Sequence, residues 1–406
     1  MISRSPSALK KIILRDKYNR AIFEKGRGRE IFLVGGYVRD TLRGSSSPDR
    51  DFIISGDLRS FACEIRAIFG GAIVQFEKGH MIRIALPEGV TFDFSAPDGS
   101  LREDLSKRDF TINAIAWSPD SQIVDYYSGR EDIKKKTIRV ISKENMTSDP
   151  LRMLRAYRFA AELNGSIQVK TRRIIKTFRN KIKEVSSERI TSELFDLLNS
   201  EHPSKYLKMA LDDGILTIIL PFAFKTLANN MRGVAEAEKA IFGTEPQVIK
   251  VLLDGLFSQN LTRRGLLYLE SLLRNASLSP PIETLTLSNK IIKRIELIRK
   301  GTKLWDDMNE LSPDILFDIF VKSREASIDV LMIKKRTDLF KAFEKFRRLW
   351  RKGLLSSEEI IDISGLPLGP ATGRIIESVK RMQFAGKIRT KKQARALINQ
   401  LVQSPD

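Results

Sequence analysis

The chain has 406 residues, 42% of them hydrophobic, so it is long enough for two or more domains with cores and is not expected to be disordered. No run of about 18 uncharged apolar residues is present, which argues against a membrane-spanning helix. Lys and Arg number 70 against 50 Asp and Glu, and the net charge of +20 favours a polyanionic partner, above all nucleic acid, over a merely solvated surface.

The cysteine and histidine content excludes two kinds of site. The single cysteine, Cys63, rules out an internal disulfide framework and fits a reducing compartment, so we expect a cytoplasmic protein. Two His and one Cys are too few for a zinc site of the usual kind or for a histidine-dependent phosphohydrolase centre.

The N-terminal part of the chain is predicted to mix α and β structure. Met1–Glu30 is rich in Lys, Arg and Ser, which leaves a transit peptide open, but we expect a helix that leads into the first domain. The apolar run Glu30–Val34 predicts a strand, and helical spacing predicts a helix at Leu58–Phe69 that ends at Gly70. Further strands are predicted at Arg50–Ser55, Met81–Leu86 and Val90–Phe94.

A glycine pair comes directly after the first predicted strand. Gly35 and Gly36 lie between this strand and a helix, where they let the backbone approach a ligand with its amide N–H groups. Arg39 is in the first turn of the helix and can contact a phosphate or pair with Asp40. A glycine pair alone is usually only a turn, so its significance depends on the neighbouring motifs.

Two aspartates stand at the start of the next predicted strand. Asp49 and Asp51 are two residues apart, so their side chains project from the same face. Adjacent carboxylates repel each other unless a cation lies between them, and Mg²⁺ is the natural ion because it can share oxygen ligands with substrate phosphates. This arrangement suits two-metal nucleotidyl transfer, although an isolated Asp-x-Asp is more often a solvated strand end.

In this order and spacing the two motifs resemble the class II tRNA nucleotidyltransferases and bacterial poly(A) polymerases, which carry a polymerase-β-like head. In that family Gly-Gly-x-Val-Arg-Asp precedes the metal-binding Asp-x-Asp. The resemblance implies an α+β head followed by helical neck, body and tail domains. It also implies that Asp49 and Asp51 are catalytic and hold Mg²⁺, and that Gly35, Gly36 and Arg39 meet the triphosphate.

A second block, Asp104–Ala114, is similar to the family's Arg-Arg-Asp-Phe-Thr-x-Asn-Ala. Lys107 replaces the first Arg and loses its forked hydrogen bonding. By resemblance, Arg108, Asp109 and Asn113 organise the ribose and phosphate side of the nucleotide pocket. Without the other motifs, a simple helix cap by Asp109 and Asn113 would be the preferred interpretation.

A third block, Ser148–Phe159, opens a long region of helical periodicity. Asp149 before Pro150 predicts a helix start with Asp149 as N-cap, and the arginines recur every three residues along one side. By resemblance Asp149 and Arg152 read the base in place of a template, because Asp offers acceptors and Arg offers donors. We also assign two further arginines of this row to nucleotide binding: Arg155 and Arg158. A plain basic helix remains the alternative, and the family's Glu is Ser148 here.

A fourth block, Glu188–Leu194, resembles the family's Glu-Arg-x-x-x-Glu-Leu, and we expect Glu188 and Glu193 to brace the neck. The motif match is dense over residues 31–194 and thinner beyond. We predict four domains, with boundaries based on the motifs and the helical pattern: the catalytic head at 1–140, the nucleotide-selecting neck at 141–210, an RNA-binding body at 211–340 and a basic RNA-binding tail at 341–406.

Positive charge gathers toward the C-terminus. Residues 341–400 contain 14 basic and 5 acidic side chains, so a charge of +9 lies in about 15% of the chain. RNA is the partner that best accounts for such a local patch. The residues that we expect to bind it are Arg347, Arg348, Arg351, Lys352, Lys380, Arg381, Lys387 and Arg389.

The expected activity is template-independent addition of nucleotides from CTP, ATP or both to the 3′ end of tRNA. In the family a flexible loop between the first two motifs is tied to the switch from C to A addition. Here the link Ser95–Glu103 is short, which favours a CC-adding variant. Asp93 could supply a third acidic ligand or face solvent. The alternatives are a poly(A) polymerase on the same scaffold and an inactive RNA-binding relative, against which the intact motifs speak.

Overall fold

The computed structural model describes residues 6–76, 81–220, 222–243, 253–274, 276–278, 282–308 and 310–403. The chain forms two compact units. The first contains Met1–Ala228 and Ile282–Leu285, and the second contains Asn229–Pro281 and Thr286–Asp406. None of the helices in these described ranges is both long and apolar enough to cross a membrane.

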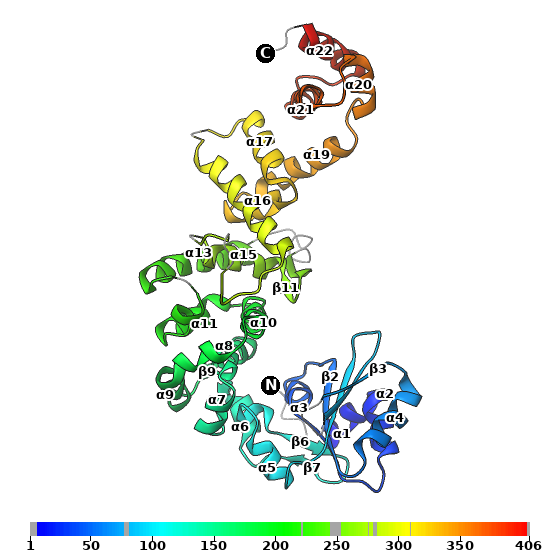
Figure 1. Ribbon diagram of the computed structural model, residues 1–406, viewed down its shortest axis with the longest axis vertical. Helices are drawn as coiled ribbons and strands as arrows, with labels where there is room; N and C mark the ends of the chain where they lie inside the picture. Colours follow the sequence, from blue (N-terminus) through cyan, green and yellow to red (C-terminus); the bar gives the residue numbers. More distant parts are fainter. Residues whose placement is uncertain are drawn as a thin grey trace. The chain divides into compact units, whose positions relative to one another are not determined.

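A seven-stranded sheet forms the centre of the head in the first unit (Figure 1). Its strand order is β3-β4-β5-β2-β1-β6-β7. Neighbouring strands are antiparallel, except that β2 and β5 are parallel. The strands are β1 (Ile31–Val34), β2 (Asp49–Ile54), β3 (Ala72–Gln75), β4 (Met81–Ala85), β5 (Thr91–Ser95), β6 (Ala116–Ser118) and β7 (Gln122–Val124).

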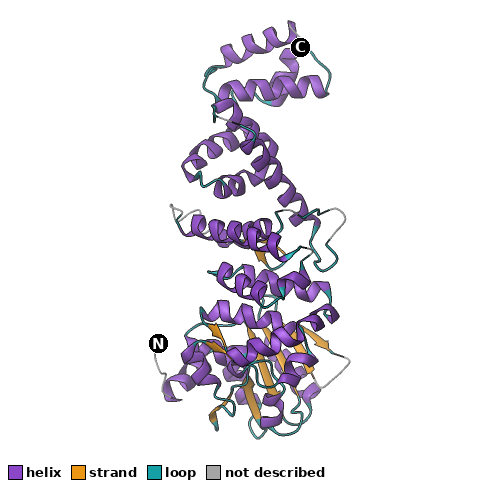
Figure 2. Ribbon diagram, turned by 90° about the vertical axis from the view of Figure 1, so that its left-hand side faces the viewer, coloured by secondary structure: helices purple, strands orange, loops and turns teal. Residues whose placement is uncertain are grey.

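Helices surround this sheet and continue along the first unit (Figure 2). Helix α4 packs on β3, β4 and β5, and α3 contacts β1 and β2. A small parallel pair, β8 (Thr137–Ile138) with β9 (Ser166–Ile167), lies in the helical part. The helices are α1 (Pro6–Arg15), α2 (Lys17–Lys25), α3 (Gly36–Arg43), α4 (Leu58–Phe69), α5 (Leu101–Ser106), η1 (Thr111–Asn113), α6 (Gly129–Lys135), α7 (Lys143–Ser148), α8 (Leu151–Leu163), α9 (Val169–Phe178), η2 (Arg179–Glu184), α10 (Ser187–Leu198), α11 (Pro203–Asp212) and α12 (Leu216–Ile219).

Alternation along β2 separates the core from the functional face. Phe52 points into a buried aromatic layer, where its ring centroid lies 5.8 Å from that of Phe23 and 5.7 Å from that of Phe94. Each such pair contributes about 1 kcal/mol beyond the area it buries. Because successive side chains point to opposite faces, Asp49 and Asp51 project to the other side of the sheet.

In its described residues the second unit is helical apart from a short antiparallel pair of strands. Its core joins α17, α18, α19 and α21 through a cluster of aromatic and aliphatic side chains, and a separate apolar cluster joins α20, α21 and α22. The elements are β10 (Leu256–Ser258), β11 (Leu261–Thr262), α15 (Arg263–Leu272), α16 (Asn289–Asp306), α17 (Pro313–Ser323), η3 (Arg324–Ala326), α18 (Ser327–Ile333), η4 (Thr337–Leu339), α19 (Phe340–Arg351), α20 (Ser357–Ser364), α21 (Pro370–Phe384) and α22 (Lys391–Gln403), while α13 (Phe224–Phe242) contains the boundary between the units.

The predicted α+β head with a helical remainder is confirmed. The predicted helix Leu58–Phe69 coincides with α4, and the predicted strands match β2, β4 and β5 to within one residue at each end. The N-terminal region contains two helices, because Asp16 accepts the amide protons of Tyr18 and Asn19 and starts a new helix there. The four-domain division of the chain stays a prediction.

Candidate active site

One cavity of about 450 Å³ in the first unit gathers residues from all of the early motifs. Its lining comes from the β1–α3 turn, from β2, β4 and β5, from the segment after α5, and from the start of α8. The lining residues are Gly35, Gly36, Tyr37, Arg39, Ser47, Asp49, Asp51, Arg83, Asp93, Arg108, Asp109, Asn113, Asp149, Arg152, Arg155, Arg158 and Phe159. All twelve residues predicted for catalysis, metal and nucleotide binding therefore line the same space.

The turn between β1 and α3 comes close to the carboxylates because Gly35 has no side chain. Its φ of 75° lies in the left-handed region, which glycine adopts without strain. A Cβ atom at Gly35 would lie 2.7 Å from Nη1 of Arg108 and 2.8 Å from Oδ2 of Asp51. Glycine at this position therefore allows the turn, the carboxylate and the guanidinium to meet at one point.

The two aspartates of β2 differ in their surroundings. Asp49 is exposed, and its Oδ1 accepts a hydrogen bond of 2.7 Å from the hydroxyl of Thr91 on β5. Asp51 is half-buried, and no described residue donates a hydrogen bond to its carboxylate or forms an ion pair with it. Burial raises the pKa of Asp51; Arg108 lowers it, and the carboxylates of Asp93 and Asp49 raise it further. Such a carboxylate is poised to accept a cation.

A third carboxylate lies beside this pair but is already engaged. Asp93 on β5 is in register with Asp51 and lines the same cavity, and its role as a third acidic ligand stays a prediction. Arg83 on β4 holds Asp93 with two hydrogen bonds of 2.6 Å. Within the described ranges, no group of three or more His, Cys, Asp or Glu side chains is arranged to hold a metal ion. The sequence did not reveal Arg83, which stands opposite Asp93 only because of the strand register.

Arg39 takes the second of its two predicted roles. It is 8% exposed, and its Nε and Nη2 donate to the two oxygens of Asp40 at 3.0 and 2.9 Å. Its Nη1 donates to Oδ1 of Asn113 at 2.7 Å. The guanidinium thus lines the cavity while it is fixed to two neighbouring side chains.

Asp109 and Asn113 connect the head to α8. The amide of Asn113 donates to Oδ1 of Asp109 at 2.8 Å, and Oδ2 of Asp109 accepts Nε and Nη2 of Arg155 at 3.0 and 2.9 Å. The backbone N–H of Phe110 also donates to Asp109. Burial raises the pKa of Asp109, but these donors outweigh it and hold the pKa below its usual range.

The arginine row on α8 is supported from α10. Glu193 is 5% exposed and forms ion pairs with Arg158 and, at 3.6 Å, with Arg155. Arg158 also pairs with Glu162 one turn further along its own helix. Glu193 therefore has the bracing position that the sequence predicted. Most of the positive charge of Arg155 and Arg158 is already compensated by carboxylates.

Asp149 and Arg152 lie at the junction of α7 and α8. The prediction that Asp149 caps α8 is wrong: its carboxylate makes no cap hydrogen bond and instead accepts Nη2 of Arg189 at 3.0 and 3.1 Å. Arg152 donates through Nη1 to the carbonyl of Asn145 at 3.1 Å. No ion pair with a carboxylate forms at Arg152 among the described residues, so most of its donors remain available to a nucleotide base.

The predicted RNA-binding residues all lie in the second unit, mostly on its surface. Six are exposed: Arg347, Arg348, Arg351, Lys352, Lys387 and Arg389. Arg381 is half-buried and pairs with Asp318 and Glu377. Lys380, also predicted to bind RNA, is only 8% exposed, and its Nζ donates to the carbonyl of Trp350 at 2.9 Å, which argues against that role.

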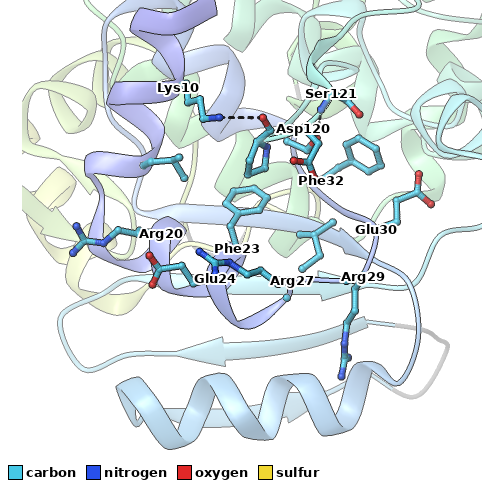
Figure 3. Close-up of a pocket in the computed structure, with 16 residues that line it drawn as sticks. Lys10, Arg20, Phe23, Glu24, Arg27, Arg29, Glu30, Phe32, Asp120 and Ser121 are labelled. Carbon is cyan, nitrogen blue, oxygen red and sulfur yellow. Dashed lines mark hydrogen bonds between the residues drawn. The ribbon is translucent and has the colours of Figure 1, made fainter.

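Another cavity of the first unit, about 440 Å³, lies among α1, α2, β1 and the β6–β7 turn (Figure 3). Lys10 donates to the carbonyl of Pro119 there at 3.4 Å. Arg20, Arg27 and Arg29 line this cavity together with acidic side chains, but it has neither the glycine turn nor paired strand carboxylates. The chemistry expected from the motifs therefore belongs to the first cavity.

Comparison with known proteins agrees with this geometry. Residues 31–139 match the poly(A) polymerase head domain, and residues 166–227 match a domain described as the "probable RNA and SrmB-binding site of polymerase A". The chain belongs to the tRNA nucleotidyltransferase and poly(A) polymerase family. Family membership makes the cavity of the first unit its candidate active site.

Similar proteins of this family span nearly the whole chain. A CC-adding tRNA nucleotidyltransferase from Geobacter sulfurreducens is 29% identical over 89% of this chain and 90% of its own length. An A-adding tRNA nucleotidyltransferase from Deinococcus radiodurans is 26% identical over 90% of this chain and 94% of its own. The Thermotoga maritima CCA-adding enzyme, solved in complex with tRNA, has the same fold, with a TM-score of 0.76 at 21% identity over 98% of both chains.

Proposed function

We propose that this protein extends the 3′ end of tRNA without a template, by nucleotidyl transfer from CTP, and that it adds the C residues of the CCA end. The observation that supports this most is the single cavity that joins the Asp49–Asp51 pair, the Gly35–Gly36 turn and the Asp149–Arg152 pair. These three groups are suited to bind, in this order, the metal, the triphosphate and the base of the nucleotide. The single exposed cysteine is in keeping with the cytoplasmic location that we infer for the reaction.

The residues present fit a magnesium site. Asp49 and Asp51 are carboxylates on one face of β2, and the carboxylate of Asp51 has no hydrogen-bond donor among the described side chains. Oxygen ligands and an uncompensated negative charge are what Mg²⁺ selects. When bound, the metal would activate the 3′-hydroxyl of the RNA and neutralise charge on the triphosphate.

The chain's own residues position the triphosphate. Gly36 is the first residue of α3 and lines the cavity, and the N–H groups of a first helical turn have no partners within their own helix. Arg108 lies beside Gly35 and Asp51, where a guanidinium offsets phosphate charge. Arg39 is held by Asp40 and Asn113, so it orders the wall of the cavity even before a nucleotide binds.

Nucleotide choice would depend on hydrogen bonding by Asp149 and Arg152. A carboxylate provides only acceptors and a guanidinium only donors, and together they can complement one Watson–Crick edge. Arg189 fixes the Asp149 carboxylate, and the Asn145 carbonyl fixes one nitrogen of Arg152. A pair that is held in place in this way can discriminate between bases without a nucleic acid template.

The preference for C addition rests on the connection after β5. Only Ala96–Ser100 separates β5 from α5, and Ser100 with Glu103 forms a capping box that fixes the start of this helix. Lys107 and Asp98 form a further ion pair across the connection. A short, tethered link leaves little chain for the movement that the resemblance associates with the change from C to A addition.

The experiment that tests this function measures Mg²⁺-dependent incorporation of CTP into tRNA that ends at the discriminator base. Asp51→Ala is expected to lower the rate by roughly a thousandfold or more, because a metal ligand at the reacting centre contributes several kcal/mol to transition-state stabilisation. Binding of tRNA, measured in the same buffer without nucleotide, should change little.

A matched control is Asp120→Ala, which removes an exposed aspartate of the β6–β7 turn from the other cavity of the same unit. This variant should incorporate CTP like the unaltered protein. Normal turnover by Asp51→Ala would remove the metal assignment, and a wild-type protein that binds tRNA but incorporates no nucleotide would favour the inactive relative.

A further inference from the structure

The second unit has a large cavity of its own, about 770 Å³ in volume. Apolar and aromatic side chains from α17, α18 and α19 line it together with several arginines. The lining residues are Arg263, Phe320, Val321, Arg324, Glu325, Ile328, Phe343, Phe346, Arg347, Trp350, Arg351 and Glu377. Nothing in the reaction described above uses this cavity.

The spacing of residues on α19 explains why aromatic and basic groups meet there. Phe343, Phe346 and Trp350 succeed one another at intervals of three and four residues, so they share one face of the helix. Arg347 and Arg351 occupy the adjoining row on the same side. One helical face thus presents aromatic rings with guanidinium groups directly beside them.

The rings pass from fully buried to exposed along this face. Phe320 and Phe343 are 0% and 3% exposed, whereas Trp350 is 42% exposed. The ring of Trp350 continues the cluster, with its centroid 5.3 Å from that of Phe346 and the two planes 31° apart. Exposure of a tryptophan at the edge of a packed aromatic cluster leaves apolar ring surface for a ligand to cover.

The charges around the cavity are predominantly positive and partly uncompensated. Its two acidic side chains have cationic neighbours outside the lining: Glu377 pairs with Arg381 at 3.2 Å and Glu325 approaches Arg294 at 3.9 Å. The guanidinium groups of Arg324 and Arg351 form no ion pair with the residues that the structure describes. Two uncompensated guanidinium groups beside exposed aromatic surface are suited to phosphate and base together.

We propose that this cavity binds an unpaired nucleotide of the RNA substrate, with its base against the Phe346–Trp350 surface and its phosphates near Arg324 and Arg351. This inference rests on the proposed function, since it takes tRNA as the substrate. Aromatic stacking combined with arginine contacts is the usual chemistry of single-stranded nucleotide recognition. A groove for a protein helix would not need this excess of positive charge.

Tryptophan fluorescence tests the site directly. Of the three tryptophans, Trp117 is 0% exposed and Trp305 is partly buried, so Trp350 is the one most accessible to a base. Titration with tRNA, or with a short unstructured oligouridine, is expected to quench the emission of the unaltered protein. Trp350→Phe should abolish this quenching. Arg351→Ala should weaken it, whereas Lys322→Ala, which removes an exposed cation of α17 outside the cavity, should preserve it.

Binding and turnover give an independent measurement. Trp350→Ala should weaken tRNA binding about tenfold, because the base loses the aromatic ring on which it stacks, whereas Trp350→Phe should retain most of the affinity. The KM for tRNA should rise in Trp350→Ala, with kcat and the KM for CTP unchanged. Circular dichroism controls for folding, and Arg324→Ala, which alters only an exposed side chain, should also weaken binding.

Three outcomes would overturn this proposal. The first is unaltered tRNA affinity in Trp350→Ala together with absent quenching. The second is quenching that persists in Trp350→Phe, and the third is self-association in analytical ultracentrifugation that Trp350→Ala removes, which would assign the face to a protein contact. If the unaltered protein incorporates no CTP, the proposed function is refuted. The oligouridine titration would still test whether the cavity binds a nucleotide.

Discussion

Gly35 determines how closely the turn after β1 approaches the carboxylates. Gly35→Ala should reduce CTP incorporation by a hundredfold or more, about 3 kcal/mol, because its Cβ would lie within 3 Å of Asp51 and Arg108 and would displace them. Gly56→Ala is the matched control, since Gly56 has a φ of 96° but no atom within 4 Å of the added Cβ. Both variants carry the backbone strain of a left-handed residue.

Steady-state CTP incorporation and thermal melting of the two glycine variants distinguish the effect of the new Cβ contact from the effect of backbone strain. Similar losses of stability are expected, with the loss of activity confined to Gly35→Ala. Equal activity in the two variants would mean that the approach of the turn to Asp51 has no role in turnover.

Residue types and spacing were sufficient to predict which side chains line the site, but not how they are paired. The two-residue period of a strand explains why Asp49 and Asp51 face the same side, and both residues do lie on strand β2 in the structure. The partners of Asp93 and Asp149 come from elsewhere in the fold, from Arg83 on β4 and Arg189 on α10. Local spacing contains no information about such partners, because tertiary packing alone brings them together.

Helix α8 connects the head to the rest of the first unit through a continuous set of charged contacts. Arg155 binds Asp109 from the head and Glu193 from α10, and Arg158 binds Glu193. A network that is fully paired resists displacement of any single member, because removal of one partner leaves a buried charge uncompensated. The helix should therefore hold Asp149 and Arg152 at its start in a fixed position.

Removal of the base-reading groups should change nucleotide choice more than RNA binding. Arg152→Ala is expected to lower the preference for CTP over UTP and GTP at least tenfold, as a charged hydrogen bond is worth about 1.5–3 kcal/mol. Competition assays with mixed nucleotides measure this ratio. Arg173→Ala on α9 removes an exposed arginine of the same unit and should leave it unchanged. Normal discrimination by Arg152→Ala would refute the assignment.

Arg189 should act through Asp149 as a positioning residue. Arg189→Ala releases the Asp149 carboxylate, so the KM for CTP should rise several-fold while kcat changes less. Arg189→Lys, which keeps the charge, should recover part of the loss. A variant that behaves like the unaltered protein would show that the tether has no influence on nucleotide selection.

The Asp109 carboxylate should contribute stability that depends on pH. Its pKa is lowered in the folded chain, so the unfolded chain takes up the proton first as the pH falls. The contribution is therefore complete above the ordinary carboxyl pKa of about 4 and is lost as the pH falls through the lower folded-state value. Asp109→Asn should cost about 3 kcal/mol at neutral pH, and this difference should shrink below about pH 4.

Urea unfolding across a pH series measures this difference, with Asp120→Asn as an exposed control. A difference between Asp109→Asn and the unaltered protein that is constant with pH would mean that the Asp109–Arg155 pair does not link protonation to folding.

Element boundaries were largely predictable because local signals set them. Helix α4 ends at Gly70, where φ is 75°, and α5 begins with the capping box of Ser100 and Glu103. The prediction for the start of α8 was wrong in one respect, since Asp149 is a good capping residue whose carboxylate pairs with Arg189 instead. A strong ion-pair partner can outcompete a local cap, and the sequence around Asp149 does not contain that partner.

The chain as a whole combines a catalytic unit with a basic helical unit. Its net charge of +20 and the exposed arginines of α19 fit a substrate with a phosphate backbone. Sequence patterns predicted a catalytic head followed by RNA-binding helical domains, whereas the aromatic cavity of the second unit became apparent only in the structure. Its members come from α15, α17, η3, α18, α19 and α21, between which no motif is apparent in the sequence.

Product length on defined substrates tests the central claim most directly. Transfer RNAs that end at the discriminator base, at C and at CC are each incubated with Mg²⁺ and a single nucleotide, and the products are resolved on a gel. We expect CTP addition to stop after two residues on the first substrate and after one on the second, with no A added to the CC end. Addition of A to the CC end, or long A tails on any RNA, would contradict assignment as a CC-adding enzyme.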